Sequence, residues 1–350
     1  MENGQRKAYY GKTRAEVQQT LTTALHDRDR GLPITSDRLT LGQYLVGWLD
    51  ASRHQLKPRS WQRYEEITRR HIAPTLGKLP LRKVTPQDVQ RLYAAKLDEE
   101  LSTTTVHYVH RTLRRALGEA ERQGMVPRNV ARLVTPPRPQ RDEMHALDSD
   151  QVRRFLGEAV GHRLEAFFTL AIHSGARVGE LLALRWKDVS LDRACLSVQA
   201  TLQRTREGGF TFASPKSARS RRQITLSPTA IVALRRHRAH QLEERLAAGD
   251  AWQDNDLVFA DILGAPLDGT HVLRYQFAPL LKRAGLPPMR LHDLRHTCAT
   301  LLLGQGINPK IVSEMLGHST VAITLDLYSH VLPTMQQSAA SALEAAIGTR

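Results

Sequence analysis

Apolar residues recur every three to four positions from residue 40 to residue 124, which is the spacing of amphipathic helices. The first stripe consists of Leu41, Tyr44, Leu45, Trp48 and Leu49, and it follows Thr40. Further stripes begin at Ser60, at Thr85-Pro86 and at Ser102. Threonine followed by proline is a common helix start, because threonine caps the helix and proline fits its first position. The pattern predicts a four-helix domain at residues 37–125.

Prolines then interrupt the helical pattern. The segment VTPPRPQRDE (residues 134–143) cannot continue a helix, so we place a linker at residues 126–145. Helical spacing resumes at Asp148 or Ser149 and returns towards the C terminus. The strand-like segments between lie at Cys195–Leu202, 210–214 and 221–226. We therefore predict a mainly α fold with a small antiparallel β-sheet, and a mixed α/β domain at residues 146–334.

Composition points to a polyanionic partner. The chain has 350 residues, with 50 Lys and Arg against 35 Asp and Glu, giving a formal charge of +15 and a pI near 10.2. A basic excess spread along the whole chain favours nucleic acid over a membrane anchor. No apolar run approaches the roughly 18–20 residues of a membrane span. Because only Cys195 and Cys298 are present, we expect a reducing cytoplasm.

Two segments place basic groups where a phosphate could bind. In HSGARVGELLALRW (residues 173–186), Arg177 begins a helix and Glu180 follows one turn later. This pair is either a simple ion pair or an arginine that the carboxylate holds for a phosphate. In SPKSARSRRQITL (residues 214–226), Lys216 lies at the tip of a predicted basic hairpin. Such a lysine is either a solvated charge or a proton donor in a DNA groove.

The segment LHDLRHTCAT (residues 291–300) allows two kinds of site. His292 and His296 are four apart, as in zinc hydrolases, but Asp293 stands where those enzymes have glutamate, and no third ligand motif follows. His292 and Arg295, three apart, share a helix face and could bind an anion. We expect His296 to be the structural histidine, with its hydrogen bonds satisfied by the fold.

The segment EMLGHSTVAITLDLYSHV (residues 314–331) contains a histidine and a tyrosine of interest. Gly317 ends a helix and exposes His318 at a turn, and Tyr328 follows ten residues later. A tyrosine in an amphipathic stretch is usually a core residue, and only about 0.1% of its phenol ionises at neutral pH. It becomes a nucleophile only if its proton has an acceptor and cations neutralise the target phosphate.

These residues occur in the order and approximate spacing of the tyrosine recombinases, and the chain resembles a phage or integrative-element integrase of that family. The matching residues are Arg177, Lys216, His292 and Arg295 of HDLR, His318 of LGH, and Tyr328. The resemblance runs from about residue 40 to residue 334. It implies a core-binding (SAM-like) domain at 37–125 and a catalytic domain at 146–334, which together form a C-shaped DNA clamp.

The resemblance also implies a mechanism without metal or cofactor. Tyr328 would attack a DNA phosphate to give a 3′-phosphotyrosine intermediate, and Lys216 would protonate the departing 5′-oxygen. The two arginines and the two matching histidines would hold the phosphate, His292 could also accept the phenol proton, and Glu180 would support Arg177. Type IB topoisomerase activity, a non-catalytic DNA-binding regulator and a zinc hydrolase are the alternatives.

The implied partner is double-stranded DNA carrying attachment or core sites. Phosphate or groove contacts are predicted for Arg63, Arg69, Arg111 and Arg114. The family further implies a homotetramer on paired sites in the bacterial cytoplasm at the nucleoid, with a directionality factor (excisionase) and a DNA-bending host protein as helpers. Residues 335–350 carry a small apolar stripe that we expect to pack into a neighbouring protomer. Residues 1–36 resemble only the last strand and helix of an arm-binding domain, so the chain is either truncated or lacks arm binding.

Overall fold

In the computed structural model the chain divides into two compact units, Met1–Asp142 and Glu143–Arg350. The structure describes residues 10, 12–29, 38–139, 144–205, 208–214 and 221–328, together with parts of 340–348. Each unit has its own hydrophobic core.

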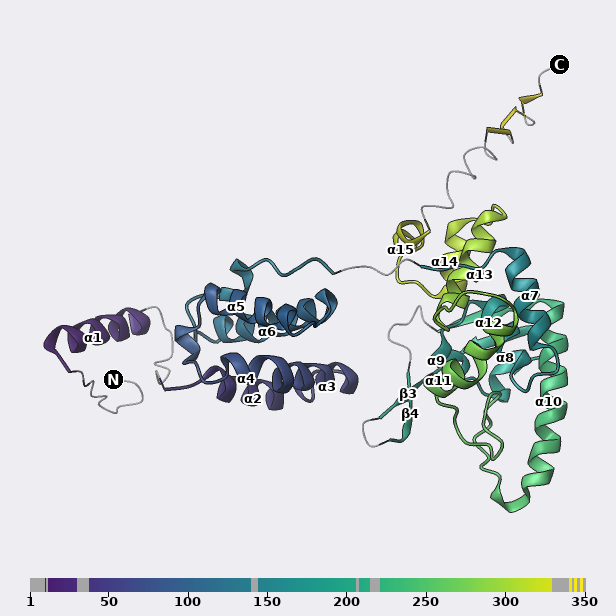
Figure 1. The fold of residues 1–350 in the computed structure, drawn as a ribbon, viewed down its shortest axis with the longest axis horizontal. Coiled ribbons are helices and arrows are strands. Elements are labelled where there is room, and N and C mark those ends of the chain that lie inside the picture. Colours follow the sequence, from purple (N-terminus) through teal and green to yellow (C-terminus); the bar gives the residue numbers. More distant parts are fainter. Residues whose placement is uncertain are drawn as a thin grey trace. The chain divides into compact units, whose positions relative to one another are not determined.

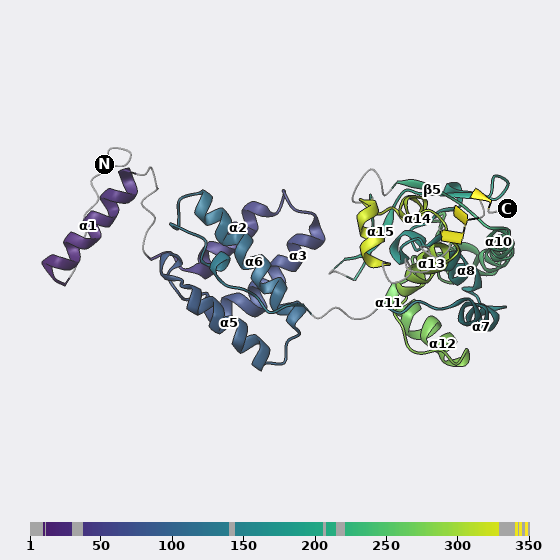
Figure 2. The same cartoon turned by 90° about the horizontal axis from the view of Figure 1, so that it is seen from above.

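The first unit is helical (Figures 1 and 2). Its helices are α1 (Arg14–Asp29), α2 (Leu41–Ser52), α3 (Pro58–Ile67), the π-helix η1 (Thr68–Ile72), α4 (Ala73–Leu76), α5 (Pro86–Asp98) and α6 (Thr103–Arg122), with 3-10 turns η2 (Leu81–Lys83) and η3 (Val130–Leu133). Thr40 caps α2 and Thr85 caps α5, each in a capping box. The predicted helix starts at Thr40, Thr85 and Ser102 are confirmed, whereas the helix expected from Ser60 begins at Pro58.

Part of the segment assigned to a linker is folded. Val126, Ala131 and Val134 are buried in the core of the helical unit, and η3 packs against α5 and α6. The prolines at 136–139 do prevent regular structure, but the apolar residues before them lose contact with water by covering α5 and α6. The helical unit therefore extends past residue 125.

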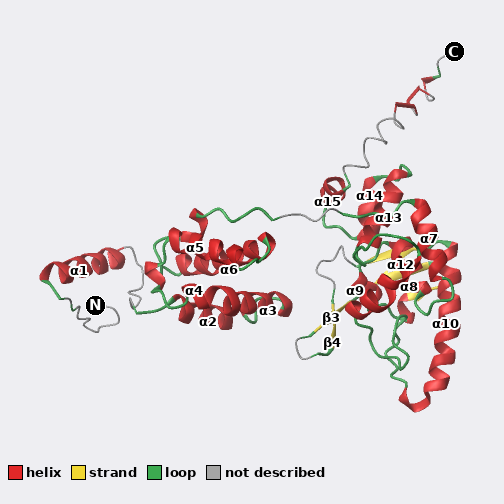
Figure 3. Ribbon diagram, in the orientation of Figure 1, coloured by secondary structure: helices red, strands yellow, loops and turns green. Residues whose placement is uncertain are grey.

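The second unit is mostly helical with short strands (Figure 3). Its elements are α7 (Ser149–Ala159), α8 (Glu165–Ser174), α9 (Val178–Leu181), η4 (Trp186–Asp188), β1 (Val189–Ser190), β2 (Cys195–Val198), β3 (Thr201–Arg204), β4 (Phe210–Ala213), β5 (Arg222–Thr225), α10 (Pro228–Ala248), η6 (Gly249–Ala251), α11 (Gly269–His271), the π-helix η7 (Val272–Phe277), α12 (Ala278–Arg283), α13 (Asp293–Gly304), α14 (Pro309–Leu316) and α15 (Val321–Leu327). Asp148 caps α7, so the first of the two predicted caps is confirmed.

The core of this unit forms around α8. Nearly every side chain of α8 is buried, and the helix packs against α10 and α13. Phenylalanine rings of α7, of η7 and of the loop that contains Phe259 pack against the two phenylalanines of α8, with neighbouring centroids 5.2–5.8 Å apart. Such ring pairs add specific geometry to apolar burial. Because α13 is anchored to α8, the polar residues at the start of α13 are held in place.

The strands form two antiparallel sheets among the described residues. One has the order β1-β2-β5, with Leu196 opposite Ile224, and the other pairs β3 with β4, with Leu202 opposite Phe212. The predicted mainly α fold with antiparallel strands is confirmed. The expected hairpin around Lys216 is wrong, because β4 and β5 flank that lysine but belong to different sheets. Lys216 itself lies outside the described residues.

Candidate active site

Three arginine side chains donate hydrogen bonds to three consecutive carbonyl groups at the C-terminal end of α14. The bonds run from Arg222 Nε to Met315 O (2.5 Å), from Arg295 Nη1 to Leu316 O (2.7 Å) and from Arg177 Nη2 to Gly317 O (3.1 Å). The arginines come from β5, from α13 and from the residue before α9. Residues more than a hundred positions apart in the sequence therefore meet at one helix end.

The end of α14 suits this role for a simple reason. The last carbonyls of a helix have no partner within the helix and carry its partial negative charge, so they attract cations. Gly317 ends the helix in the left-handed conformation, with φ of 69°. A Cβ atom at this position would lie 2.9 Å from Nη1 of Arg222, so the close approach of the arginine depends on the missing side chain.

Arg177 is held by Glu180, as the sequence predicted. Arg177 Nη1 donates to Glu180 Oε1 (2.8 Å), and the main-chain N–H of Arg177 donates to Oε2 (3.0 Å). Arg222 Nη2 donates to the same Oε2 (2.8 Å). Burial alone would raise the pKa of Glu180, but bonds from Arg222 and Arg177 hold it below its usual range. The Arg177 side chain remains 38% exposed, so it can still reach an anion.

Arg295 is buried, and it neighbours the other two arginines. Its Nη1 donates to Gly175 O (2.8 Å) as well as to Leu316 O. Burial, with Arg177 and Arg222 nearby, lowers the pKa of this guanidinium to about 9. The three arginines carry a charge of +3 and Glu180 carries −1, so this group has a net charge of +2. A cluster with this excess attracts an anion strongly.

His292 and His318 lie beside the arginines. His292 is the residue before α13, and His318 follows Gly317, with its Nδ1 2.8 Å from Thr324 Oγ1. Desolvation of the rings, followed by the charges of Arg295 and other neighbours, lowers the pKa of each histidine to about 4. Both imidazoles are therefore neutral at pH 7, and each has one ring N–H group to donate. His292 is exposed and His318 is partly exposed.

Tyr328 lies in a small apolar cluster and is hydrogen-bonded to His296. The side chain is 1% exposed, and its cluster includes Leu303, Val312 and Leu316. The phenol oxygen is 2.8 Å from His296 Nδ1. Burial raises the pKa of Tyr328 to about 12 and lowers the pKa of His296. His296 has the satisfied hydrogen bond expected of a structural histidine. Its partner is Tyr328, the predicted nucleophile, and this pairing was not predicted from the sequence.

Two residues of this group were not selected from the sequence as site residues, namely Arg222 and His296. The signal for His296 was its spacing of four from His292, and their rings are 5.4 Å apart. Arg222 had no comparable signal, because it stands in a run with Arg219 and Arg221. Of the six predicted catalytic residues, the structure places five in this region, and Lys216 is outside the described residues.

The predicted DNA-contacting arginines lie on the helical unit, and all four are exposed. The guanidiniums of Arg63 and Arg111 lie over the ring of Tyr108, at 4.9 and 5.9 Å from its centroid. Arg69 forms an ion pair with Glu65 at 3.2 Å. These contacts orient basic groups on the surface, and their binding to DNA stays a prediction.

Among the described residues, no group of three or more histidine, cysteine, aspartate or glutamate side chains is placed to hold a metal ion. No helix in that part of the chain is long and apolar enough to cross a membrane.

Known proteins share this sequence pattern. Residues 145–335 match the phage integrase family, and residues 40–97 match the phage integrase N-terminal SAM-like domain. The chain belongs to the phage integrase family. A relative named tyrosine recombinase XerC-like, from Caldanaerobacter subterraneus subsp. tengcongensis, is 30% identical across 98% of this chain and 93% of its own. An integrase of Streptomyces ambofaciens is 33% identical, covering 94% of this chain and 86% of its own.

Solved integrase structures have the same fold. The Tn1549 transposon integrase in complex with transposon right end DNA matches with a TM-score of 0.74 and 21% identity, over 87% of this chain and 99% of that one. A lambda integrase tetramer bound to a Holliday junction matches with a TM-score of 0.61 and 19% identity, over 92% and 89%. The predicted family, the tyrosine recombinases, and the predicted enzyme class of this integrase are confirmed.

Proposed function

We propose that this integrase cleaves and rejoins double-stranded DNA at specific sites through a 3′-phosphotyrosine bond at Tyr328. The observation that supports this most is that Arg177, Arg295 and the phenol of Tyr328 lie together around the end of α14. Arg177 is partly exposed, and His292 and His318 beside it are exposed or partly exposed. The phenol packs in the same cluster as Leu316, whose carbonyl binds Arg295. Integrating or excising a phage or another mobile element is the biological task that fits this chemistry.

The charge of the arginine cluster suits phosphoryl transfer. A phosphodiester carries −1, and its pentacoordinate transition state carries about −2, which the net +2 of the cluster balances. Arg177 and Arg295 would bind the non-bridging oxygens, with His292 and His318 adding hydrogen bonds. Arginine contacts of this kind contribute on the order of 10³–10⁵ in rate in phosphoryl transfer.

The phenol proton passes to His296 in this proposal, rather than to His292. With its own proton on Nε2, neutral His296 accepts the phenol hydrogen bond at Nδ1 and takes the proton as the phenol oxygen bonds to phosphorus. The bond from phosphorus to the 5′-oxygen breaks, and Lys216 donates a proton to that oxygen. The reverse reaction joins the new strand, so neither a metal nor a nucleotide cofactor is needed.

DNA binding involves both units in this proposal. The helical unit, through Arg63, Arg69, Arg111 and Arg114, and the catalytic unit enclose the duplex as a clamp. Two paired sites are bridged by a homotetramer, with residues 335–350 packing into the neighbouring protomer. A directionality factor and a DNA-bending host protein assist at the nucleoid, in the bacterial cytoplasm.

The nucleophile is tested with Tyr328→Phe on a nicked suicide duplex that carries the site. This variant should bind the duplex as the wild type does and form no covalent protein–DNA adduct. Tyr93→Phe is a matched control, because the Tyr93 hydroxyl is also 2.8 Å from a histidine Nδ1, that of His110, but in the helical unit. An adduct of normal yield from Tyr328→Phe would assign the nucleophile elsewhere.

The same assay separates the alternatives. If the wild type forms no adduct on any site-bearing duplex, the chain is a non-catalytic DNA-binding regulator. If it forms the adduct but only relaxes a supercoiled plasmid carrying paired sites, the activity is that of a type IB topoisomerase. Exchange between the paired sites supports recombination.

A further inference from the structure

We infer that Arg222 is a positioning residue for cleavage, which fixes the phosphate-binding arginine Arg177 and the turn that carries His318. This inference rests on the proposed function. Arg222 is the first residue of β5, immediately after the segment that contains Lys216, and none of its contacts was visible in the sequence.

The Arg222 guanidinium is buried and is hydrogen-bonded to a carboxylate and a main-chain carbonyl. Its side chain is 6% exposed, and Glu180, its ion-pair partner, is 5% exposed. The guanidinium spans 2.8 Å to Glu180 and 2.5 Å to the carbonyl of Met315. A buried ion pair is costly to break from one side, because the remaining charge loses its partner in a medium that solvates it poorly. These two contacts of Arg222 therefore hold neighbouring protein groups in place.

The first of these groups is Arg177. Glu180 divides its charge between Arg222 and Arg177, and this leaves Arg177 with a surplus of positive charge for a phosphate. Without Arg222, the whole carboxylate charge falls on Arg177. Arg177 is then more nearly neutralised and binds the phosphate less well, although it is still present.

The second group is the turn after α14. The Arg222 side chain fills the space against Gly317 where a Cβ would lie and holds the carbonyl of Met315. His318 follows directly, so the arginine sets the position of its main chain. Arg222 thus contacts both Glu180, which holds Arg177, and the end of α14, which precedes His318.

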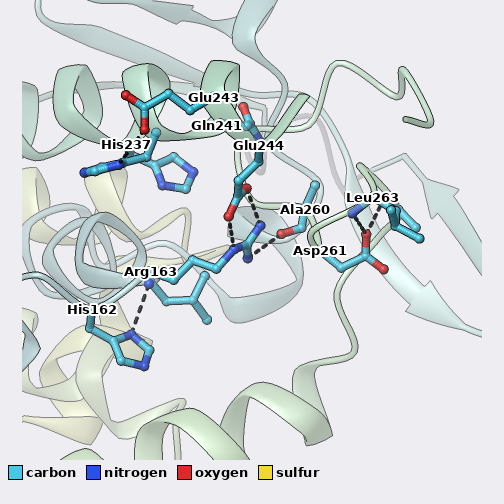
Figure 4. Close-up of polar contacts among 12 residues, drawn as sticks. His162, Arg163, His237, Gln241, Glu243, Glu244, Ala260, Asp261 and Leu263 are labelled. Atoms are coloured by element: carbon cyan, nitrogen blue, oxygen red, sulfur yellow. Dashed lines mark hydrogen bonds and ion pairs between the residues drawn. The ribbon is translucent and has the colours of Figure 1, made fainter. Parts of the chain in front are cut away.

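The experiment compares Arg222→Met with Arg163→Met, in the full chain, by single-turnover cleavage of suicide duplexes. Arg163 makes the same kinds of contact elsewhere in the unit (Figure 4). It donates to both carboxylate oxygens of Glu244 (2.5 and 2.8 Å) and to the carbonyl of Ala260 (2.8 Å). The Arg163–Glu244 pair is more exposed than the Arg222–Glu180 pair, so its loss should cost less stability, and the free energy of unfolding of each variant is measured beside its cleavage rate. Of the two arginines, Arg222 is the one that contacts the candidate site.

Two substrates separate positioning from general damage. One has the natural phosphodiester, and the other has a neutral methylphosphonate at the cleavage position, which needs less cationic charge in the transition state. We expect Arg222→Met to slow cleavage of the phosphodiester by about 10²-fold, the size of effect that misplaced groups produce, and that of the methylphosphonate by less than about 10-fold. Arg163→Met should change both rates by the same small factor. The double variant Arg222→Met with Glu180→Gln, which restores the charge balance, should recover part of the loss.

The outcomes are distinct from those that test the proposed function. Equal slowing of both substrates by Arg222→Met would overturn the inference, as would rates equal to those of Arg163→Met. If Arg222→Met does not fold, Arg222→Gln removes the charge but can still form hydrogen bonds, and it must show the same substrate preference. If the wild type itself forms no adduct, the proposed function fails, and with it the basis of the inference.

Discussion

From the hydrogen bond between Tyr328 and His296 we predict how substitutions of either residue change the free energy of unfolding and the rate of DNA cleavage. The bond is partly buried and 2.8 Å long. A hydrogen bond within a protein contributes about 0.5–1.5 kcal/mol to stability. Because His296 keeps some contact with water, we expect Tyr328→Phe to lower the free energy of unfolding by about 0.5–1.5 kcal/mol. For a domain of roughly 150–250 residues, each kcal/mol lowers the Tm by about 2–4 °C.

A double-mutant cycle isolates this bond from other effects of the substitutions. Tyr328→Phe, His296→Leu and the double variant are compared by urea unfolding of the full chain, and the two changes should be coupled by about 1 kcal/mol. The cycle of Tyr93→Phe with His110→Leu serves as the reference, since that pair has the same 2.8 Å separation. Additive effects at residues 296 and 328, beside coupled effects at residues 93 and 110, would show that the bond does not form in solution.

Cleavage then tells whether His296 also accepts the proton. His296→Gln supplies a carbonyl that accepts the phenol hydrogen bond but cannot take up a proton at neutral pH. Loss of a general base lowers rates by about 10²–10⁴-fold, so adduct formation should slow by that factor while DNA affinity is unchanged. Because burial lowers the pKa of His296, the wild-type rate should fall only as the pH drops below 6.5. A His296→Gln rate equal to that of the wild type would return the role of base to His292.

Three further predictions concern other parts of the molecule. Lys216→Ala should cleave slowly and recover when sulfur replaces the 5′-oxygen, because sulfur leaves without a proton; no recovery would reduce the lysine to a DNA contact. The pKa of His292 and of His318 is about 4 in the folded chain, against about 6.5 when unfolded, so the unfolded chain binds more protons between these values. The free energy of unfolding should therefore decrease from pH 7 to pH 4, and less steeply in the His318→Gln variant; an equal slope in that variant contradicts the assignment. Log affinity for DNA should fall with log salt at a slope near −5 to −9, and Arg63→Ala should make it shallower by about 1, whereas an unchanged slope would place Arg63 away from the phosphates.

Local signals in the sequence were sufficient for the helices and their ends. Thr40, Thr85, Ser102 and Asp148 each cap the helix that they were expected to begin, because capping depends on residues within one turn. Strand pairing depends on distant residues, and there the prediction failed. The strands on either side of Lys216 were expected to pair with each other, but β5 pairs with β2, which places Ile224 beside Leu196 in the core.

The sequence identified those site residues that are charged or polar within an apolar segment. It did not identify a site residue that stands among other residues of its own type. Arg177 and Arg295 stand beside glycine and histidine in apolar segments, so each attracted attention on its own. Arg222 stands among other arginines, and only the tertiary structure shows that it reaches Glu180, 42 positions earlier. The partner of His296 is 32 positions away, a distance that no helical or strand period connects.

The way in which the arginines bind the end of α14 should allow many substitutions in this part of the sequence. The arginines rest on main-chain oxygens, which every residue type supplies, so Met315 and Leu316 can be exchanged for other apolar residues without altering what the guanidiniums bind. The restrictions fall on apolar packing at Leu316, which lies in the cluster of Tyr328, and on shape at Gly317, where any side chain would displace Arg222. We expect many variants of this helix end to remain active, provided that they keep an apolar residue at 316 and glycine at 317.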